Sequence, residues 1–304
     1  MRNLEARAPC FAAGARRRPA LLGVGLAVAV VLATSLGLPA AGDPPAVPGF
    51  ELLGKNAAGL AEYRHLGTGL VFVRLEGGSF EMGSPLGELG RFATEDPVHT
   101  VAVRPFLLSK TELTAGAWER IMGTRPWWGQ NYSRVGDTFP ATHISWNDCR
   151  AFAEKTGLRL PTEAEWEYAC RAGSRAAYCF GSDVAQLGEY AWYEDNTWNR
   201  GVRAIQAVGG RKANAYGLKD MHGNVSEWCE DTWHADYVGA PADGRAWVDV
   251  DLDPRRVYRG GSWVFEAGTV RSAVRMCAAA TFQTDHLGFR PAASLPAAGE
   301  GAGR

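Results

Sequence analysis

Two carboxylates flank a tight turn in the later part of the 304-residue chain. Asp220 and Glu227 stand on either side of Gly223-Asn224, and both turn residues tolerate positive φ at little cost. Their side-chain oxygens could therefore meet on one side of the turn, beside main-chain carbonyls freed by the bend. Carboxylate and carbonyl oxygens are the ligands that calcium takes in proteins. The turn therefore indicates either a calcium-binding loop or a hairpin with solvated acids and Trp228 in the core.

The composition limits the classes of protein to which the chain can belong. Lys and Arg number 32 against 33 Asp and Glu, a net charge of -1, so no basic excess points to a nucleic-acid partner. A hydrophobic content of 46% and a charged content of 21% suit one large globular domain or two smaller ones. The 37 glycines, 16 prolines and 11 tryptophans predict a loop-rich fold with aromatic anchors rather than a helical bundle.

The N-terminal segment has the pattern of an export signal. Residues 1–18 are basic, residues 20–38 carry no charge, and small residues follow at 40–42. The apolar run is also about long enough to span a bilayer. Residues 1–42 are therefore expected to be a cleaved signal peptide or an N-terminal membrane anchor through 20–38. In either case the remainder would be extracytoplasmic: secreted, periplasmic, or held at the outer face of the inner membrane.

Proline and glycine divide the rest of the chain into segments. Residues 43–61 are rich in Pro, Gly and Ala and are interpreted as a linker, ahead of an ordered domain expected over 62–292. Residues 293–304 are interpreted as a disordered tail. Short apolar stretches bounded by turn residues predict strands at 70–75, 79–84, 99–103, 106–108, 256–263 (running into a turn), 270–276 and 288–290.

Three short helices are predicted by residues that begin and end helices. They run from Thr114 to Gly123, from Ser145 to Gly157 and from Thr162 to Gly173, each with a hydroxyl side chain at its start and a glycine after its end. Thr162-x-x-Glu165 is a full capping box. From Gly181 onward the patterning is weak, and such a long irregular region within a compact domain usually forms a functional surface.

The order of these segments resembles the formylglycine-generating enzyme family, also called the sulfatase-modifying factor family. The resemblance implies an α+β fold of the C-type-lectin-like class, rich in loops and with little regular secondary structure. It covers about 70–292 and rests on the blocks Gly77–Ser84, Lys110–Thr114, Ser145–Asp148, Arg159–Ala169, Tyr216–Leu218 with the Gly223-Asn224 turn, Arg259–Trp263 and Gly288–Arg290.

The resemblance also implies calcium as a cofactor. The family's calcium ligands map here onto Asp220, the carbonyls of Gly223 and Val225, and Glu227. A second family calcium site would begin at Asn196 and Thr197. Its later acidic ligand has no match in residues 199–209.

The chemistry is where this chain departs from the family pattern. Active members hold Cu(I) between two cysteine thiolates just after the Gly-Gly-Ser turn, because this soft ion prefers sulfur. Here Phe265 occupies the first cysteine position, and Ala267 or Val270 occupies the second. Carbon side chains cannot ligate copper, so copper is not expected as a cofactor.

Other residues of the family's peptide cleft are retained as ligand-binding candidates: Ser262, Trp263, Arg271 and Arg275. The alternative for them is ordinary hydrogen bonding within the fold. Among the cysteines, the family resemblance implies a disulfide between Cys170 and Cys277. The remaining three of the exported part, Cys149, Cys179 and Cys229, are left unassigned, and none has zinc-like spacing.

Three functions are compatible with the sequence, so whether the protein is an enzyme stays open. The first is an exported, calcium-stabilised module that binds a peptide or small molecule. The second is a non-copper oxidase, like the family members in siderophore maturation that also lack the cysteine pair, aided by acids such as Glu266, Asp231 or Asp285. The third is true formylglycine generation on a sulfatase cysteine, which the missing pair contradicts.

Overall fold

The computed structural model describes residues 44–249 and 255–295, and the fold lies in the unit that begins at Ala46. The predicted signal or anchor at 1–42 lies outside the described residues, as does most of the predicted tail. Across the two described ranges no helix is both long and apolar enough to cross a membrane.

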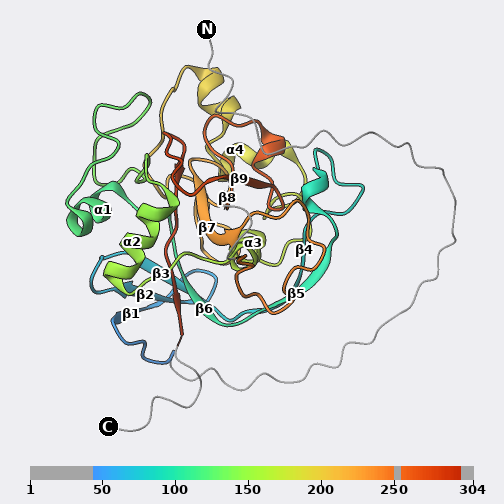
Figure 1. The fold of residues 1–304 in the computed structure, drawn as a ribbon, viewed down its shortest axis with the longest axis horizontal. Coiled ribbons are helices and arrows are strands. Elements are labelled where there is room, and N and C mark those ends of the chain that lie inside the picture. The colour runs from blue at the N-terminus through green and yellow to red at the C-terminus, as the bar shows by residue number, and fades with distance from the viewer. Residues whose placement is uncertain (1–43, 250–254, 296–304) are drawn as a thin grey trace, which may run out of the picture. The chain divides into compact units, whose positions relative to one another are not determined.

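The largest sheet is antiparallel and joins the two ends of this unit. Its strand order is β1-β2-β3-β6-β11, so the first and last strands belong to the same sheet although they are far apart in the chain. In Figure 1 these strands run below and to the left of the fold's centre. Their bounds are β1 (Phe50–Lys55), β2 (Ala61–His65), β3 (Val71–Leu75), β6 (Phe106–Ser109) and β11 (Ala292–Ser294).

Two smaller sheets complete the strand content of the described residues. The second sheet has the order β10-β7-β8-β9, with a parallel pair between β10 (Leu287–Gly288) and β7 (Ser226–Thr232). The antiparallel partners are β8 (Arg255–Arg259) and β9 (Arg275–Ala279). The third pairs β4 (Gly78–Met82) with β5 (His99–Val103). The glycines at 77 and 78 predicted a hairpin between the strands at 70–75 and 79–84, and this is wrong, because β3 pairs with β2 and β6 instead.

The three predicted helices are confirmed as α1 (Ala115–Met122), α2 (Trp146–Thr156) and α3 (Glu163–Arg171). The hydroxyls of Thr114, Ser145 and Thr162 each accept a hydrogen bond from the backbone N–H three residues later. The remaining helical pieces are α4 (Leu187–Tyr190) and the 3-10 turns η2 (Ala93–Glu95), η3 (Val184–Gln186), η4 (Glu194–Asn196), η5 (Trp198–Arg200) and η6 (Ala267–Thr269).

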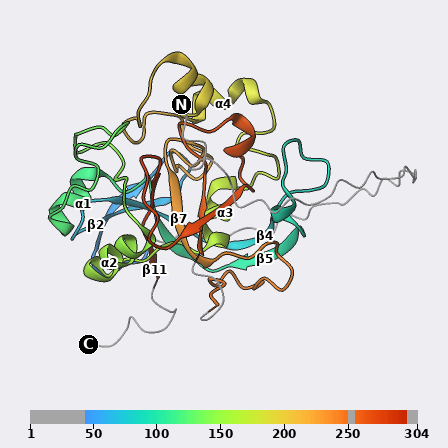
Figure 2. The same ribbon diagram turned by 45° about the horizontal axis from the view of Figure 1, so that its top comes forward.

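The helix α3 lies at the junction of the sheets. It contacts β4 and β5 on one side and β7 and β8 on another, and both ribbon views show it next to β7 (Figures 1 and 2). Nearly all of its residues are buried, its three glutamates among them. A short helix buried on several sides must pair its charged groups internally. The charged residues of α3 are therefore expected to form ion pairs within the fold.

Three predicted boundaries are wrong. The expected linker at 43–61 contains β1, because the ring of Phe50 packs edge-on against Phe72 at 5.3 Å, and the strand continues through a bulge between Leu52 and Gly54. The expected tail contains β11, which pairs with β6 as far as Ser294. The strand expected at 270–276 begins only at Arg275, because the preceding residues form a turn anchored by Arg271.

Candidate functional site

The carboxylate of Glu227, at the start of β7, is enclosed by two side chains. The guanidinium of Arg290 donates from Nη2 to Oε1 at 2.7 Å and from Nε to both oxygens at 3.0 and 3.1 Å. The indole Nε1 of Trp166, from α3, donates to Oε2 at 2.6 Å. All three side chains are fully buried. Because each carboxylate oxygen has about two acceptor positions, these four contacts fill Glu227.

Asp220 lies near Glu227 but is less fully bonded. Its backbone is left-handed, with φ of 58°, and its side chain is buried in the loop before β7. Oδ2 accepts a hydrogen bond from the backbone N–H of Gly209. Oδ1 is buried and has no hydrogen-bond donor among the residues that the structure describes.

A third acid, Glu112, completes this group, and the sequence analysis did not single it out. It follows β6 and is fully buried, and its Oε1 accepts a hydrogen bond from Asn224 Nδ2 at 2.9 Å. Its Oε2 is buried and finds no donor within the described ranges. Glu112 and Asp220 are close enough for each to affect the pKa of the other. The family block around Lys110–Thr114 contained Glu112, but its partners come from more than 100 residues away.

Burial dominates the acidity of these two carboxyl groups. Loss of solvent, followed by the Asp220 charge, raises the pKa of Glu112 well above its ordinary value. Loss of solvent also raises the pKa of Asp220, against the opposing hydrogen bond from Gly209. Two adjacent buried carboxylates repel each other unless a proton or a cation lies between them.

The predicted calcium ligands do not all fit the ion equally well. Asp220 fits, since it has a buried oxygen without a donor. Glu227 does not fit, since Arg290 and Trp166 already occupy it. Gly223 is needed for packing, because a Cβ there would lie 2.1 Å from the Trp192 carbonyl oxygen at φ of +90°. The Val225 side chain packs in a small apolar cluster. For Gly223 and Val225 the predicted ligand atoms are the backbone carbonyls, and that role stays a prediction.

The second predicted calcium position does not fit the ion. Both ends of the Asn196 side-chain amide are occupied locally: Nδ2 donates to Ala191 O at 2.8 Å, and Oδ1 accepts from Tyr193 N at 2.9 Å. Thr197 is buried and its hydroxyl donates to Tyr193 O. In the described part of the chain, no group of three His, Cys, Asp or Glu side chains could hold a metal ion.

In the turn at the family's copper position, hydrocarbon side chains stand where the two cysteine ligands would be. Gly261 has φ of 64°, and a Cβ on it would lie 2.7 Å from Val270 Cγ1, so the chain folds back tightly. Val270 is fully buried and Ala267 is half-buried in η6. The Phe265 ring packs edge-on against His286 with centroids 5.5 Å apart.

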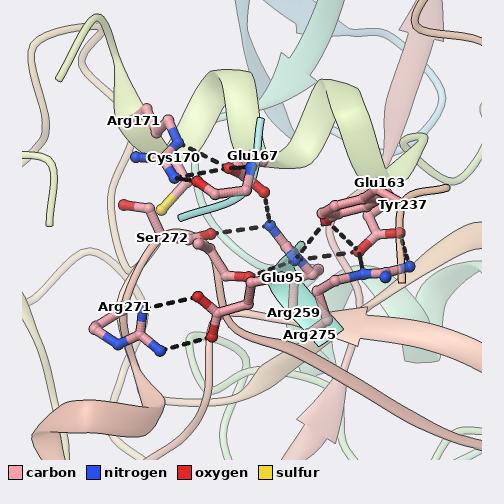
Figure 3. A network of polar contacts seen from close by, with 12 residues as sticks. Glu95, Glu163, Glu167, Cys170, Arg171, Tyr237, Arg259, Arg271, Ser272 and Arg275 are labelled. Carbon is pink, nitrogen blue, oxygen red and sulfur yellow. Dashed lines mark hydrogen bonds and ion pairs between the residues drawn. The ribbon is translucent and has the colours of Figure 1, made fainter. Parts of the chain in front are cut away.

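Arg271 and Arg275, which are predicted to bind a ligand, have their guanidinium groups committed inside the fold (Figure 3). Arg271 uses all of its N–H groups on the 88–95 loop and on Gly268 O, with Glu95 as a bidentate partner at 2.6 and 3.0 Å. Arg275 binds Glu163 at 2.6 and 2.9 Å and two backbone carbonyls. Each is about 1% exposed, which leaves no surface for an external ligand.

The same buried network holds α3 to β8. Arg259 donates to Glu163 at 3.1 Å, to Glu167 and to the carbonyls of Ser272 and Ala273 (Figure 3). The two glutamates are fully or almost fully buried, so the ion pairs replace the solvation that they lose. Arg259, in the motif Arg-Gly-Gly-Ser-Trp, is therefore a structural residue.

Ser262 and Trp263, two predicted ligand-binding residues, do not lie on the surface of the protein. Both side chains are fully buried. The Trp263 ring packs between Trp198 and Tyr132 at 5.9 and 5.8 Å. Ser262 Oγ and Trp263 Nε1 have no hydrogen-bond partner within the described segments. A ligand would reach them only after a movement of the covering loops.

The predicted Cys170–Cys277 disulfide is wrong, because Cys170 is a free thiol. Its Sγ donates toward Met221 O at 3.6 Å beneath α3, whereas Cys277 Sγ lies 3.9 Å from the Arg255 guanidinium on β8. Burial raises the pKa of Cys170 to about 12, so it is not a reactive thiolate at neutral pH. Cys149, Cys179 and Cys229 are also free.

The acids named for a non-copper oxidase are scattered. Asp231 is buried and accepts backbone hydrogen bonds from Glu163 and Trp247 at 2.7 and 2.8 Å. Glu266 is exposed. Asp285 lies next to the Phe265 corner, where its Oδ1 is 2.8 Å from His286 Nδ1.

The fold identifies the structural class of this protein, and the sequence match identifies its family. A loop-rich α+β unit whose first and last strands share a sheet is of the C-type-lectin-like class, and solved structures confirm it. Residues 58–295 match the sulfatase-modifying factor enzyme 1-like domain. The chain belongs to that family, as the motifs predicted.

The names of the similar proteins include both a formylglycine-generating enzyme and an inactive one. The formylglycine-generating enzyme of Streptomyces coelicolor is 30% identical, over 72% of this chain and 87% of that one. The inactive Cα-formylglycine-generating enzyme 2 of Bos taurus is 29% identical, over 72% and 86%. Among solved structures, PvdO from Pseudomonas aeruginosa has a TM-score of 0.69 at 32% identity, covering 83% of this chain and all of that one.

Proposed function

We propose that this protein is an exported family member that does not generate formylglycine through copper. Instead it binds a peptide or a small molecule on a calcium-stabilised scaffold. The observation that carries the proposal is the turn after Ser262, where Phe265 and Ala267 or Val270 replace the two sulfur ligands. Cu(I) would find neither of its two sulfur ligands there.

The names of the relatives do not decide between activity and inactivity, since one active and one inactive enzyme match about equally well. The proposal that this protein lacks formylglycine-generating activity therefore rests on the residues at the turn. Export is supported by the signal-like pattern of residues 1–42. The irregular region from Gly181 onward, held on the rigid core around α3, offers the loop surface that binding proteins use.

Calcium would act on the scaffold rather than on a reacting group. Asp220 supplies a buried oxygen without a donor, and the ion would tie the loop before β7 to the sheet. Calcium supplies positive charge to oxygen ligands and takes no part in electron transfer. Its expected effect is therefore on stability and on the order of the loops.

A second candidate function is a non-copper oxidation of a small molecule. It is favoured by the pair His286–Asp285, which stands against the Phe265 ring at the family's copper position. The Asp285 carboxylate accepts the Nδ1 proton and so orients the imidazole. An imidazole held in this way could take the proton of a bound hydroxyl or thiol, while the substrate gives up two electrons and two protons in all to dioxygen, which becomes hydrogen peroxide.

The proposal is tested with a Cys-x-Pro-x-Arg peptide in air. The protein is loaded with Cu(I) and calcium and incubated with the peptide, which is then weighed by mass spectrometry. The formylglycine-generating enzyme of Streptomyces coelicolor, treated identically, is the positive control. We expect an unchanged peptide and no copper retained by this protein. Conversion of the thiol to an aldehyde would overturn the proposal.

Oxygen uptake with catechol or thiol substrates, lost in His286→Gln, would favour the second function instead.

A further inference from the structure

A cavity of about 390 Å³ opens between β4 and the C-terminal end of α3. The two elements are in direct contact and lie next to each other in Figure 1. The walls come from β4 and the glycine turn before it, from the end of α3 and the loop after it, and from Tyr216. Of the described residues, those at the family's copper turn (262–270) do not line it. Small-molecule sites have volumes of about 300–1,000 Å³, so the cavity can hold a compact ligand.

Three aromatic rings form one side of this cavity: Phe80, Tyr168 and Tyr216. The ring of Tyr168 meets that of Phe80 edge-to-face with centroids 5.6 Å apart, and that of Tyr216 at a tilt, also at 5.6 Å. All three side chains are half-buried, so part of each ring stays accessible. Aromatic rings bind other rings through offset-stacked and edge-to-face contacts, so this wall suits an aromatic ligand.

Hydrogen bonds hold the two tyrosine rings in place. The Tyr216 hydroxyl donates to the Tyr168 hydroxyl at 3.2 Å, which in turn donates to Gly77 O at 2.7 Å. The backbone of Tyr216 is also fixed, because its N–H donates to Asn214 Oδ1 and its carbonyl accepts from Asn56 Nδ2, both at 3.0 Å. The rings are therefore ordered before a ligand arrives, which favours binding.

The two arginines that line the cavity differ in what they can offer a ligand. The Arg171 guanidinium is committed to Glu167 at 2.8 Å and to two backbone carbonyls (Figure 3). Arg175 is exposed and has no hydrogen-bond or ion-pair partner for its side chain in the described part of the chain. The Ser174 hydroxyl accepts from Ala176 N at 3.2 Å and so fixes the backbone on either side of Arg175. Arg175 therefore supplies a cation at a defined place on the cavity wall.

The one acid that lines the cavity points away from the rings. Glu81 is next to Phe80 on β4, and successive side chains of a strand lie on opposite faces. Its Oε1 accepts a hydrogen bond from the Thr100 hydroxyl at 2.6 Å. The accessible charge beside the aromatic wall is therefore positive, which favours an anionic ligand over a cationic one.

We propose that this cavity binds an aromatic carboxylate, whose ring lies against Phe80, Tyr168 and Tyr216 and whose carboxylate pairs with Arg175. The planar guanidinium matches a carboxylate with two parallel hydrogen bonds. The inference rests on the binding part of the proposed function, for which it names a pocket and a class of ligand. It is independent of copper and of calcium.

Binding to the full chain is tested by saturation-transfer NMR with three probes: phenylacetate, its uncharged analogue phenylacetamide, and acetate. A ligand as small as phenylacetate should bind with a Kd on the order of 1 mM. Phenylacetamide should bind roughly fivefold more weakly, because it lacks the charge that pairs with an exposed arginine. Acetate, which lacks the ring, should show no transfer.

Variants assign the two contacts. Arg175→Gln should bind phenylacetate and phenylacetamide equally, and this ratio does not depend on the stability of the variant. Phe80→Leu should bind both about tenfold more weakly and keep the preference for the acid. The matched control is Arg200→Gln, because Arg200 is also exposed and without a side-chain partner among the described residues, and it does not line the cavity. It should bind all probes as the wild type does.

Four results would overturn the proposal. They are no transfer to phenylacetate in the wild type, equal binding of acid and amide by the wild type, a preference for the acid that persists in Arg175→Gln, and binding of acetate as tight as that of phenylacetate. The last would mean that an exposed arginine attracts any anion. None of these results affects the copper and peptide assay, so the two proposals fail separately.

Discussion

Removal of the Arg290 guanidinium should strongly destabilise the fold. In Arg290→Met, Glu227 loses three of its four hydrogen bonds and stays buried as an uncompensated charge. The carbonyls of Ser109 and Lys219 lose their donor as well. Breaking a buried ion pair from one side costs about 3–5 kcal/mol. For a domain of this size, that corresponds to a melting temperature lower by roughly 6–20 °C.

The matched control is Arg64→Met, on the same fold and with the same change of side chain. Arg64 also pairs with a glutamate, Glu51, at 2.9 Å, but both side chains are about half exposed. Exposed pairs contribute less than about 1 kcal/mol. Both variants are unfolded in urea and followed by circular dichroism. A cost for Arg290→Met no larger than that for Arg64→Met would refute the argument that Glu227 depends on this pair.

Two further variants test other parts of the core. Burial and the Glu163 carboxylate raise the pKa of Asp231 to about 8, against about 4 in an unfolded chain. Between these values the native state holds a proton that the unfolded state has lost. This group therefore lowers the free energy of unfolding by up to about 1.4 kcal/mol per pH unit as the pH rises. Urea titrations from pH 5.5 to 7.5 should show a flatter profile for Asp231→Asn, and parallel profiles would contradict the assignment. Gly223→Ala should prevent soluble folding, because its Cβ would overlap Trp192 O at 2.1 Å; a normally stable variant would show that the turn can relax.

Interactions within a few residues were predictable from the sequence. The caps Thr114, Ser145 and Thr162 bond to N–H groups three residues away, and the structure shows all three. The family followed from blocks of residues in order, and the absence of sulfur at Phe265 followed from the residue type alone. None of these conclusions depends on how distant segments pack.

The partners of the charged residues were decided by tertiary structure. Arg271 pairs with Glu95, 176 residues away, and Arg290 pairs with Glu227, 63 residues away. Nothing in the local pattern distinguishes such arginines from surface residues that could meet a ligand, and nothing marks Glu112 as a neighbour of Asp220. A buried charge is paired by whichever segment the fold brings to it, because desolvation makes an unpaired one too costly. The sequence by itself therefore determined the family, the caps and the missing copper ligands, and only the fold decided which acids are neutralised by which arginines.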